Sequence, residues 1–137
     1  MSPEYVVDTH ALVWSMYAPA RLGRAAAAVF AEVDAGRAIA QVPAVVVAEV
    51  LMVVERGRLP GVGLAHLLPQ LEAMRASDNY KLVPLLPEVV IGSHTLTAIP
   101  DIFDRLIVAE ALVRGLHLVT KDGIIHGSGL VATIWDS

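Results

Sequence analysis

Short apolar segments alternate with longer segments of helical spacing along the whole chain. The short segments predict buried strands at residues 4–8, 37–42, 81–84, 117–120 and 130–135. Between them, apolar residues recur at helical spacing, as Leu12, Val13 and Met16 do, which predicts helices. Strands that alternate with helices are typical of a parallel sheet covered by helices on both faces. We therefore expect an α/β fold with a central, mainly parallel sheet.

Capping residues, glycines and prolines mark the ends of the predicted helices. Helices are expected from residue 8 or 9, over 21–36, 43–57, 62–76, 87–99 and 104–114, with a turn at 121–123. Pro69 is expected to kink or divide its helix, because proline cannot donate the helical hydrogen bond. No repeat or linker interrupts the pattern, so we expect a single domain over residues 1–137.

The composition is unusually apolar, with 55% hydrophobic residues and a mean hydropathy of +0.61. A membrane-spanning helix needs roughly 20 nearly uncharged residues in a row. The most apolar stretch, residues 38–54, is interrupted by Pro43 and Glu49, so no such helix is predicted. The N-terminal segment does not resemble a signal peptide, because Glu4 and Asp8 stand where a basic start and an apolar block would be. We therefore expect a cytoplasmic protein without membrane association, part of whose apolar surface another chain covers.

The charged residues and the lack of cysteine limit the possible chemistry. The chain has 14 acidic and 10 basic residues, and its net charge of −4 argues against nucleic-acid binding through bulk positive charge. A nuclease of this composition needs a metal ion and a few local Arg or Lys side chains to accept phosphate. Because there is no cysteine, any metal must be bound by oxygen or imidazole, which favours Mg²⁺ or Mn²⁺.

Four acidic residues occupy positions that meet at one edge of the predicted sheet. In a parallel sheet, ligands bind beyond the carboxyl ends of the strands, and Asp8 and Asp122 follow two of the predicted strands. Glu49 and Asp104 lie near the starts of helices that follow loops from the same side. Clustered carboxylates repel one another, which raises some of their pKa values unless a divalent cation is bound. Such an oxygen-rich site suits Mg²⁺ or Mn²⁺.

Four short motifs around these acids resemble those of the PIN-domain family. They are Val6-Val7-Asp8-Thr9-His10, Val47-Ala48-Glu49-Val50, Asp101-Ile102-Phe103-Asp104-Arg105-Leu106-Ile107-Val108-Ala109 and Val119-Thr120-Lys121-Asp122. The resemblance is closest to VapC-type toxins of bacterial toxin-antitoxin pairs, and it extends to residues 131–135, which are similar to the family's last strand. It implies a three-layer α/β/α fold and a Mg²⁺- or Mn²⁺-dependent endoribonuclease with RNA as substrate. It also implies a homodimer and inhibition by a small cognate antitoxin.

The resemblance also implies roles for individual residues. The family's catalytic, metal-binding acids match Asp8, Glu49, Asp104 and Asp122. Thr120 takes the position of a hydroxyl residue that supports the pocket. The implied reaction is attack by a metal-activated water on the phosphodiester, which leaves a 3′-hydroxyl and a 5′-phosphate. Two departures concern the geometry of the pocket, since Ala44 lies where the family often has Ser or Thr, and Ile102 replaces a common proline.

Each acid also has a purely structural interpretation. Asp8 suits a helix cap, Asp104 suits the first turn of a helix, and Asp122 before a glycine suits a turn. Asp101 is either an outer ligand or the cap of the helix that contains Asp104, and the cap is the simpler interpretation. Glu49 differs, because it interrupts an apolar helical pattern where an unpaired carboxylate is unfavourable. A function or a buried partner is therefore expected for Glu49.

Basic residues near the motifs have two interpretations each. Arg105 and Lys121 either contact phosphate or form surface ion pairs. The five histidines are scattered, and ordinary partly buried roles are expected for most of them. His10 and His126 lie near proposed acids and are candidates for the rim of the pocket.

Two other functions fit the same residues. The chain is alternatively a housekeeping nuclease that processes RNA or cleaves DNA, or an inactive PIN-like binding protein whose acids are structural. The presence of all four acids favours an active enzyme over a binding protein.

Overall fold

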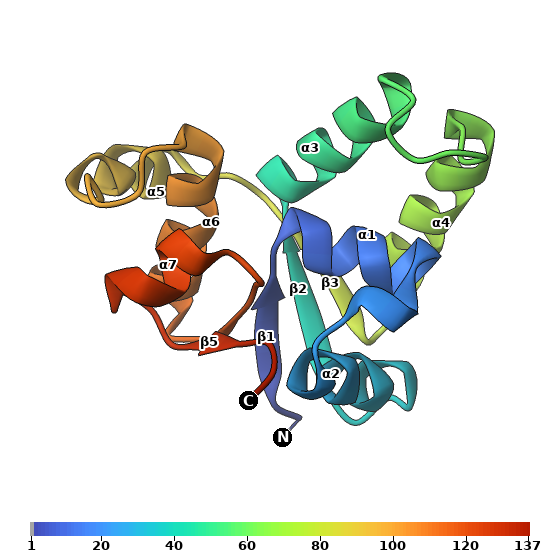
Figure 1. The fold of residues 1–137 in the computed structure, drawn as a ribbon, viewed down its shortest axis with the longest axis horizontal. Helices are drawn as coiled ribbons and strands as arrows, with labels where there is room; N and C mark the ends of the chain where they lie inside the picture. Colours follow the sequence, from blue (N-terminus) through green and yellow to red (C-terminus); the bar gives the residue numbers. More distant parts are fainter. Residues whose placement is uncertain (1) are drawn as a thin grey trace.

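The computed structural model describes residues 2–137, and its centre is a five-stranded parallel sheet (Figure 1). The strands are β1 (Glu4–Val7), β2 (Ile39–Pro43), β3 (Tyr80–Val83), β4 (Leu118–Val119) and β5 (Thr133–Ile134). They lie in the order β3-β2-β1-β4-β5, and every neighbouring pair is parallel. The chain proceeds outward from β1 in both directions, so the strand order switches between β1 and β4. Such a switch point is the usual place for a ligand site in an open parallel sheet.

Helices cover the sheet on both sides. They are α1 (Thr9–Tyr17), α2 (Arg24–Asp34), α3 (Ala44–Glu55), α4 (Leu64–Ala76), α5 (Pro87–Gly92), α6 (Ile102–Arg114) and α7 (Gly123–Ser128), with 3-10 turns η1 (Pro19–Arg21) and η2 (Ser93–Thr95). In Figure 1, α1 to α4 lie to the right of β1, and α5 to α7 lie to its left. The predicted three-layer α/β/α fold is therefore confirmed.

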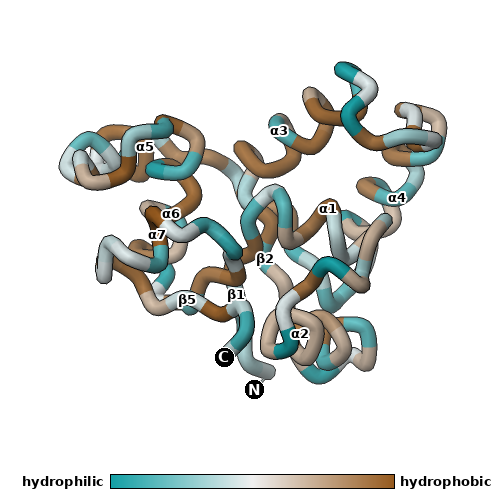
Figure 2. Tube along the Cα trace, in the orientation of Figure 1, coloured by the Kyte–Doolittle hydropathy of each residue, from teal (hydrophilic) through white to brown (hydrophobic). Residues whose placement is uncertain are grey.

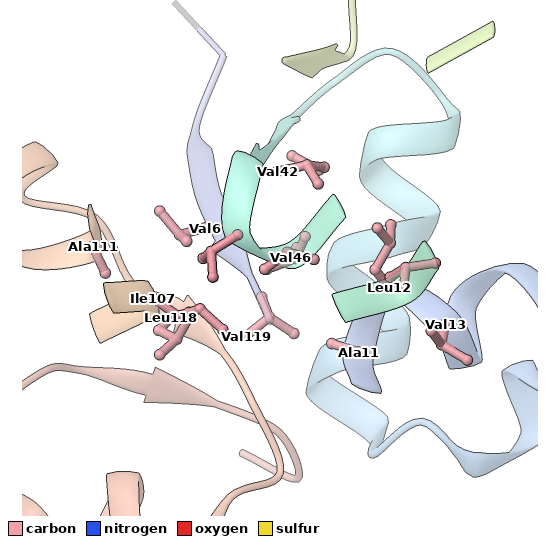
Figure 3. Packing of buried hydrophobic residues seen from close by; sticks show 14 of the residues in the cluster. Val6, Ala11, Leu12, Val13, Val42, Val46, Ile107, Ala111, Leu118 and Val119 are labelled. Atoms are coloured by element: carbon pink, nitrogen blue, oxygen red, sulfur yellow. The ribbon is translucent and has the colours of Figure 1, made fainter. Parts of the chain in front are cut away.

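The core lies between the sheet and the helices. Val6 of β1 and Leu118 of β4 are fully buried, and they belong to one cluster with Leu12 of α1, Val46 of α3 and Ile107 of α6 (Figure 3). Figure 2 shows hydrophobic segments along β2, α3 and α6. Burial of side chains of this size contributes roughly 1.5–3 kcal/mol each. The core therefore fixes the strand ends and helix starts from which the candidate acids project.

Helix α4 runs unbroken through Pro69, so of the two alternatives expected there, a kink or a division of the helix, the division is wrong. Leu67 and Leu71, on either side of the proline, are buried in the core cluster. Pro69 removes one backbone donor, and the packing of these two leucines outweighs that loss.

Two helix starts differ from the prediction because aspartates cap them. The last long helix begins at Ile102 rather than Asp104, since Asp101 Oδ1 accepts hydrogen bonds from the N–H groups of Phe103 at 2.8 Å and Asp104 at 3.1 Å. The segment after the expected turn at 121–123 forms the short helix α7, with Asp122 as its cap. Glycine is common in that segment and weakens its helical pattern, so the sequence does not predict α7.

The other boundaries shift by a few residues. Pro43 ends β2 and precedes α3, α5 ends at Gly92 and continues as η2, and β5 is limited to Thr133–Ile134. No helix among residues 2–137 is both long enough and apolar enough to cross a membrane.

Candidate active site

The carboxyl ends of β1 and β4 meet at one edge of the sheet. Val7 of β1 lies opposite Val119 of β4, and the N–H of Asp8 donates to the carbonyl of Val119 at 3.1 Å. Asp8 follows β1 directly, and Asp122 follows β4 after a short connection. The parallel pairing therefore brings Asp8 and Asp122 to the same end of the sheet.

A cavity of about 390 Å³ opens at this edge. Glu49 reaches it from α3 and Asp104 from the first turn of α6, so all four candidate acids line it together with Asp101. The other lining residues are Thr9, His10, Trp14, Ile107 and Lys121. Five carboxyl side chains thus share one cavity. Among the described residues that line it, Lys121 is the only Lys or Arg.

Three aspartates of the cavity cap helices. Asp8 Oδ1 accepts a hydrogen bond from the N–H of Ala11 at 2.9 Å, and Asp122 Oδ1 accepts one from the N–H of Ile125 at 2.9 Å. Asp101 caps α6 in the same way. The helix-cap interpretation of Asp8 and Asp101 is confirmed, and Asp122, for which the sequence predicts a turn, caps a helix as well. A cap does not exclude metal binding, because a carboxylate has two acceptor oxygens. Capping fixes Oδ1 of each side chain, and the carboxylate keeps further acceptor positions for a ligand.

A threonine holds Glu49 in place. The hydroxyl of Thr9 donates to Glu49 Oε1 at 2.8 Å, which joins the start of α1 to α3 across 40 positions of the sequence. Thr9 is buried and Glu49 is partly buried. Thr9 thus supplies the partner that the apolar surroundings of Glu49 require, and it does so without a hydroxyl at Ala44. The sequence signal for this role is weak, because a hydroxyl beside Asp8 is equally typical of a helix start.

Burial and mutual repulsion raise the pKa values of the cavity acids. Burial is the main cause at Asp8, whose pKa rises from 3.8 to about 6 although hydrogen bonds to its carboxylate oppose the change. The pKa of Asp104 rises from 3.8 to about 7; burial is the main cause, and repulsion by the other four acids of the cavity contributes. Burial also raises the pKa of Glu49. The fully ionised cavity is therefore unfavourable unless a cation is bound.

Thr120 links Asp8 to Asp122. Its side chain is buried, and its hydroxyl oxygen accepts a hydrogen bond from the N–H of Asp122 at 3.0 Å. A hydrogen bond with Thr120 is also the largest contribution that opposes the effect of burial on the pKa of Asp8. A hydroxyl donates and accepts simultaneously, so the two contacts are compatible. Thr120 therefore lies where it can hold two of the acids in a fixed relation.

The donor set of the cavity fits a hard divalent cation. The candidate ligands are all carboxylates, the ligand type that Mg²⁺ and Mn²⁺ prefer in proteins. Among residues 2–137, no group of three or more Asp, Glu or His side chains already has the arrangement of a metal site. Carboxylates that repel one another draw together only when a cation neutralises them. The fit therefore rests on donor chemistry and clustering rather than on a preformed arrangement.

The raised pKa of Asp104 predicts how the metal-free protein responds to pH. A carboxyl group with a raised folded-state pKa stabilises the fold fully below pH 3.8, and this contribution is lost as the pH rises through about 7. Asp104→Asn carries no such charge, so its melting temperature should exceed that of the wild type by an amount that grows from about pH 4 to about pH 8. Because Asp104 is partly exposed, we expect a difference of about 1 kcal/mol, or roughly 3 °C. Thermal unfolding in chelator measures it, and a pH-independent difference would contradict the assignment.

The two basic residues beside the acids have different environments. Arg105 Nε donates to the carbonyl of Ile99, so this side chain holds the loop that precedes α6. Lys121 Nζ lies 5.1 Å from the centre of the Trp14 ring. Within residues 2–137 neither forms an ion pair with an acid, so the surface ion pairs considered for them are not found.

The two histidines near the acids also differ. His10 lines the cavity, and its ring lies 5.5 Å from the ring of Trp14. His126 does not line the cavity, and its Nδ1 lies 2.7 Å from Thr133 Oγ1. Of these two histidines, only His10 lies at the cavity.

Comparison with known sequences finds one family. The profile of the family described as PIN domain matches residues 5–126, a range that contains all four candidate acids. A search of curated proteins finds no match.

Solved structures share the fold at low sequence identity. VapBC2 from Rickettsia felis, bound to a DNA fragment from its promoter, is 15% identical with a TM-score of 0.68, covering 97% of this chain and 99% of that one. A toxin-antitoxin complex from Klebsiella pneumoniae is 14% identical with a TM-score of 0.67, covering 97% and 98%. Mycobacterium tuberculosis VapC20, a sarcin-ricin loop cleaving toxin, is 16% identical with a TM-score of 0.66, covering 93% and 96%. At these identities the likeness shows a common fold.

Proposed function

The chain belongs to the PIN domain family, and from this premise we propose that it is a metal-dependent endoribonuclease. The proposed catalytic and metal-binding residues are Asp8, Glu49, Asp104 and Asp122, with Mg²⁺ or Mn²⁺ as the ion. The observation that carries the proposal is the convergence of these acids, from separate elements, on one cavity where their charges raise the pKa of Asp104 beyond the effect of burial. Strongly perturbed carboxyl groups in a cavity are typical of functional sites.

The cavity residues orient the reacting groups for hydrolysis of a phosphodiester. A divalent ion, when bound, supplies positive charge to a phosphate oxygen and lowers the pKa of the attacking water. Asp8 and Asp122 accept hydrogen bonds from the helix N–H groups that they cap, and Glu49 accepts one from Thr9, so these contacts hold the three carboxylates at the cavity. One of these carboxylates orients the attacking water. Cleavage then leaves a 3′-hydroxyl and a 5′-phosphate, and the 2′-hydroxyl of the RNA takes no part.

Thr120 acts in this proposal as a positioning residue. Its contacts with Asp8 and with the N–H of Asp122 span the two strand ends from which these acids project. Loss of the hydroxyl would remove one partner of the Asp8 carboxylate and the acceptor of the Asp122 N–H while leaving every carboxylate in place, so its effect on the reaction is indirect.

We also propose that the chain is the toxin of a toxin-antitoxin pair, with a small antitoxin as partner, a homodimer as its assembly and the cytoplasm as its location. The antitoxin partner is supported by the similar structures from Rickettsia felis and Klebsiella pneumoniae, which are VapBC2 and a toxin-antitoxin complex. On this chain, large apolar side chains are exposed around α5 and the start of α6; they are Val90, Ile91, Ile102 and Phe103. Exposed apolar patches are typical of surfaces that another chain covers.

A panel of structured RNAs, incubated with the purified chain and Mg²⁺ or Mn²⁺, tests the proposed activity. We expect internal cleavage of at least one RNA, with products that carry a 5′-phosphate and a 3′-hydroxyl. A 2′,3′-cyclic phosphate would contradict the mechanism, because it requires attack by the 2′-hydroxyl. DNA of matched sequence serves as the control substrate, and cleavage of DNA in preference to RNA would favour a DNA-cleaving nuclease of the same fold.

One observation favours an inactive binding protein as the second candidate. Asp8, Asp101 and Asp122 already have structural roles as caps, so their presence alone does not require catalysis. Such a protein would cleave neither RNA nor DNA with any metal. The same RNA panel therefore separates the two candidates.

A further inference from the structure

Two cationic side chains lie over one tryptophan beside the acidic cavity. The guanidinium carbon of Arg21 is 4.5 Å from the centre of the Trp14 ring, and Lys121 Nζ is 5.1 Å from it. Both distances are within the range of a cation–π interaction. We call Trp14, Arg21 and Lys121 the Trp14 cluster. Trp14 and Lys121 also line the cavity, so the cluster borders the site of the acids.

The fold holds the Trp14 cluster from three separate segments. Trp14 belongs to α1, Arg21 to η1, and Lys121 to the connection between β4 and α7. The ring of Trp135 packs edge-on against Trp14 at 5.8 Å. The carbonyl of Trp135 accepts a hydrogen bond from the N–H of Ala26 at 2.9 Å, which fixes the C-terminal segment against α2 (Figure 1). The position of the ring is therefore set by packing on several sides.

The same C-terminal contact depends on a glycine. A Cβ atom on Gly23 would lie 2.5 Å from the carbonyl oxygen of Trp135, which is too close for any other residue without movement of the backbone. One residue separates Gly23 from Arg21, the last residue of η1. The close packing of Gly23 against Trp135 therefore keeps Arg21 and Trp135 on the same part of the surface.

The environment of the two cations suits an external anion. Within residues 2–137 neither Arg21 nor Lys121 forms an ion pair, and both side chains are exposed. Trp14 is only 9% exposed as a residue, and Arg21 and Lys121 lie over its ring, so a nucleobase has no free face of this ring on which to stack. The ring therefore orients the cations rather than binding a base itself. Two oriented and unpaired cations are a suitable binding site for a phosphate group.

We propose that Arg21 and Lys121, oriented by Trp14, bind a backbone phosphate of RNA adjacent to the phosphodiester held in the acidic cavity. This inference rests on the proposed function. The net charge of −4 and the five acids of the cavity repel a polyanion, so the RNA needs a local cationic contact near the site of cleavage. Contacts with backbone phosphates position a nucleic acid without reading its sequence. The cluster is therefore expected to affect the affinity for RNA rather than the choice of sequence.

Fluorescence anisotropy with a labelled single-stranded RNA, in chelator so that no cleavage occurs, tests this site. We expect the double variant Arg21→Gln/Lys121→Gln to raise the Kd at least about tenfold. The slope of log affinity against log salt should fall by about 0.7, the value for one phosphate of a single strand. Arg56→Gln/Arg58→Gln is the matched control, because it removes the same charge at exposed positions that lie outside the cavity lining and that form no ion pair within residues 2–137. Its Kd and salt slope should change much less.

Equal effects of the two double variants, or no measurable RNA binding by the wild type, would overturn the site. The result for this phosphate site can be distinguished from the result for the proposed nuclease activity. Loss of binding that is specific to the double variant supports the site even if the wild type cleaves no RNA. Conversely, wild-type cleavage together with unchanged binding by the double variant overturns the site and leaves the nuclease activity standing.

Discussion

Asp104→Asn and Asp8→Asn are each expected to reduce RNA cleavage roughly a hundredfold or more, with little loss of folded protein. Each substitution keeps the side-chain volume and the capacity for hydrogen bonding but removes one negative charge from the cavity. If these acids bind the metal, the loss of one carboxylate weakens both ion binding and catalysis. Cleavage rates at saturating Mg²⁺ or Mn²⁺ provide the measurement.

The stability of the same variants separates a metal ligand from a helix cap. Asparagine caps a helix about as well as aspartate, so the contact from Asp8 Oδ1 to the N–H of Ala11 has a ready replacement. Removal of charge also relieves the repulsion that contributes to the raised pKa of Asp104. We therefore expect the metal-free melting temperatures of both variants to equal or exceed that of the wild type.

A control substitution distinguishes the cavity from a general effect of charge. Asp78 is exposed and lies outside the cavity lining, so Asp78→Asn makes the same chemical change away from the site. It should leave cleavage unchanged. Near-wild-type cleavage by both cavity variants would show that Asp8 and Asp104 are only structural, and the proposed site would be wrong.

Removal of divalent ions should abolish cleavage while the fold persists. The core is built from buried apolar side chains such as Val6, Leu118 and Ile107, and it does not depend on an ion. The chelated protein should therefore keep its far-ultraviolet circular dichroism and unfold in one cooperative transition. Addition of Mg²⁺ or Mn²⁺ in excess of the chelator should restore the activity.

One result would contradict the dependence of cleavage on a divalent ion. Cleavage that continues at the wild-type rate after dialysis against chelator, in buffers checked for residual metal, would reject the hydrolytic mechanism. A variant such as Asp104→Asn, assayed in parallel, shows whether any residual activity belongs to this chain or to a contaminating nuclease. Contaminating activity would be the same in both samples.

Much of the fold follows from local sequence patterns, because parallel strands buried on both faces are short and apolar. The segments around Val6 and Val119 show this pattern, and their order with the helices indicates the α/β class. Failures occur where packing or capping overrides local preference. The buried Leu67 and Leu71 carry α4 through Pro69, and the cap at Asp122 starts a glycine-rich helix.

The candidate acids are accessible to sequence reasoning because their positions depend on strand and helix ends. Asp8 and Asp122 follow strands, and strand ends meet at one edge of a parallel sheet whatever the details of packing. The contact between Thr9 and Glu49 spans 40 positions and depends on how α1 meets α3, which no local pattern specifies. The approach of Arg21 and Lys121 to Trp14 depends on tertiary packing in the same way.

Binding of Mn²⁺ to the metal-free chain tests the central claim most directly, because it detects the ion itself rather than a product of catalysis. Electron paramagnetic resonance of free Mn²⁺ during a titration gives the number of bound ions and their Kd. We predict saturable binding by the wild type and by Asp78→Asn, and binding weakened about tenfold or more in Asp8→Asn and Asp104→Asn. No saturable binding by the wild type, or equal affinity in all four proteins, would contradict the assignment of these acids as metal ligands.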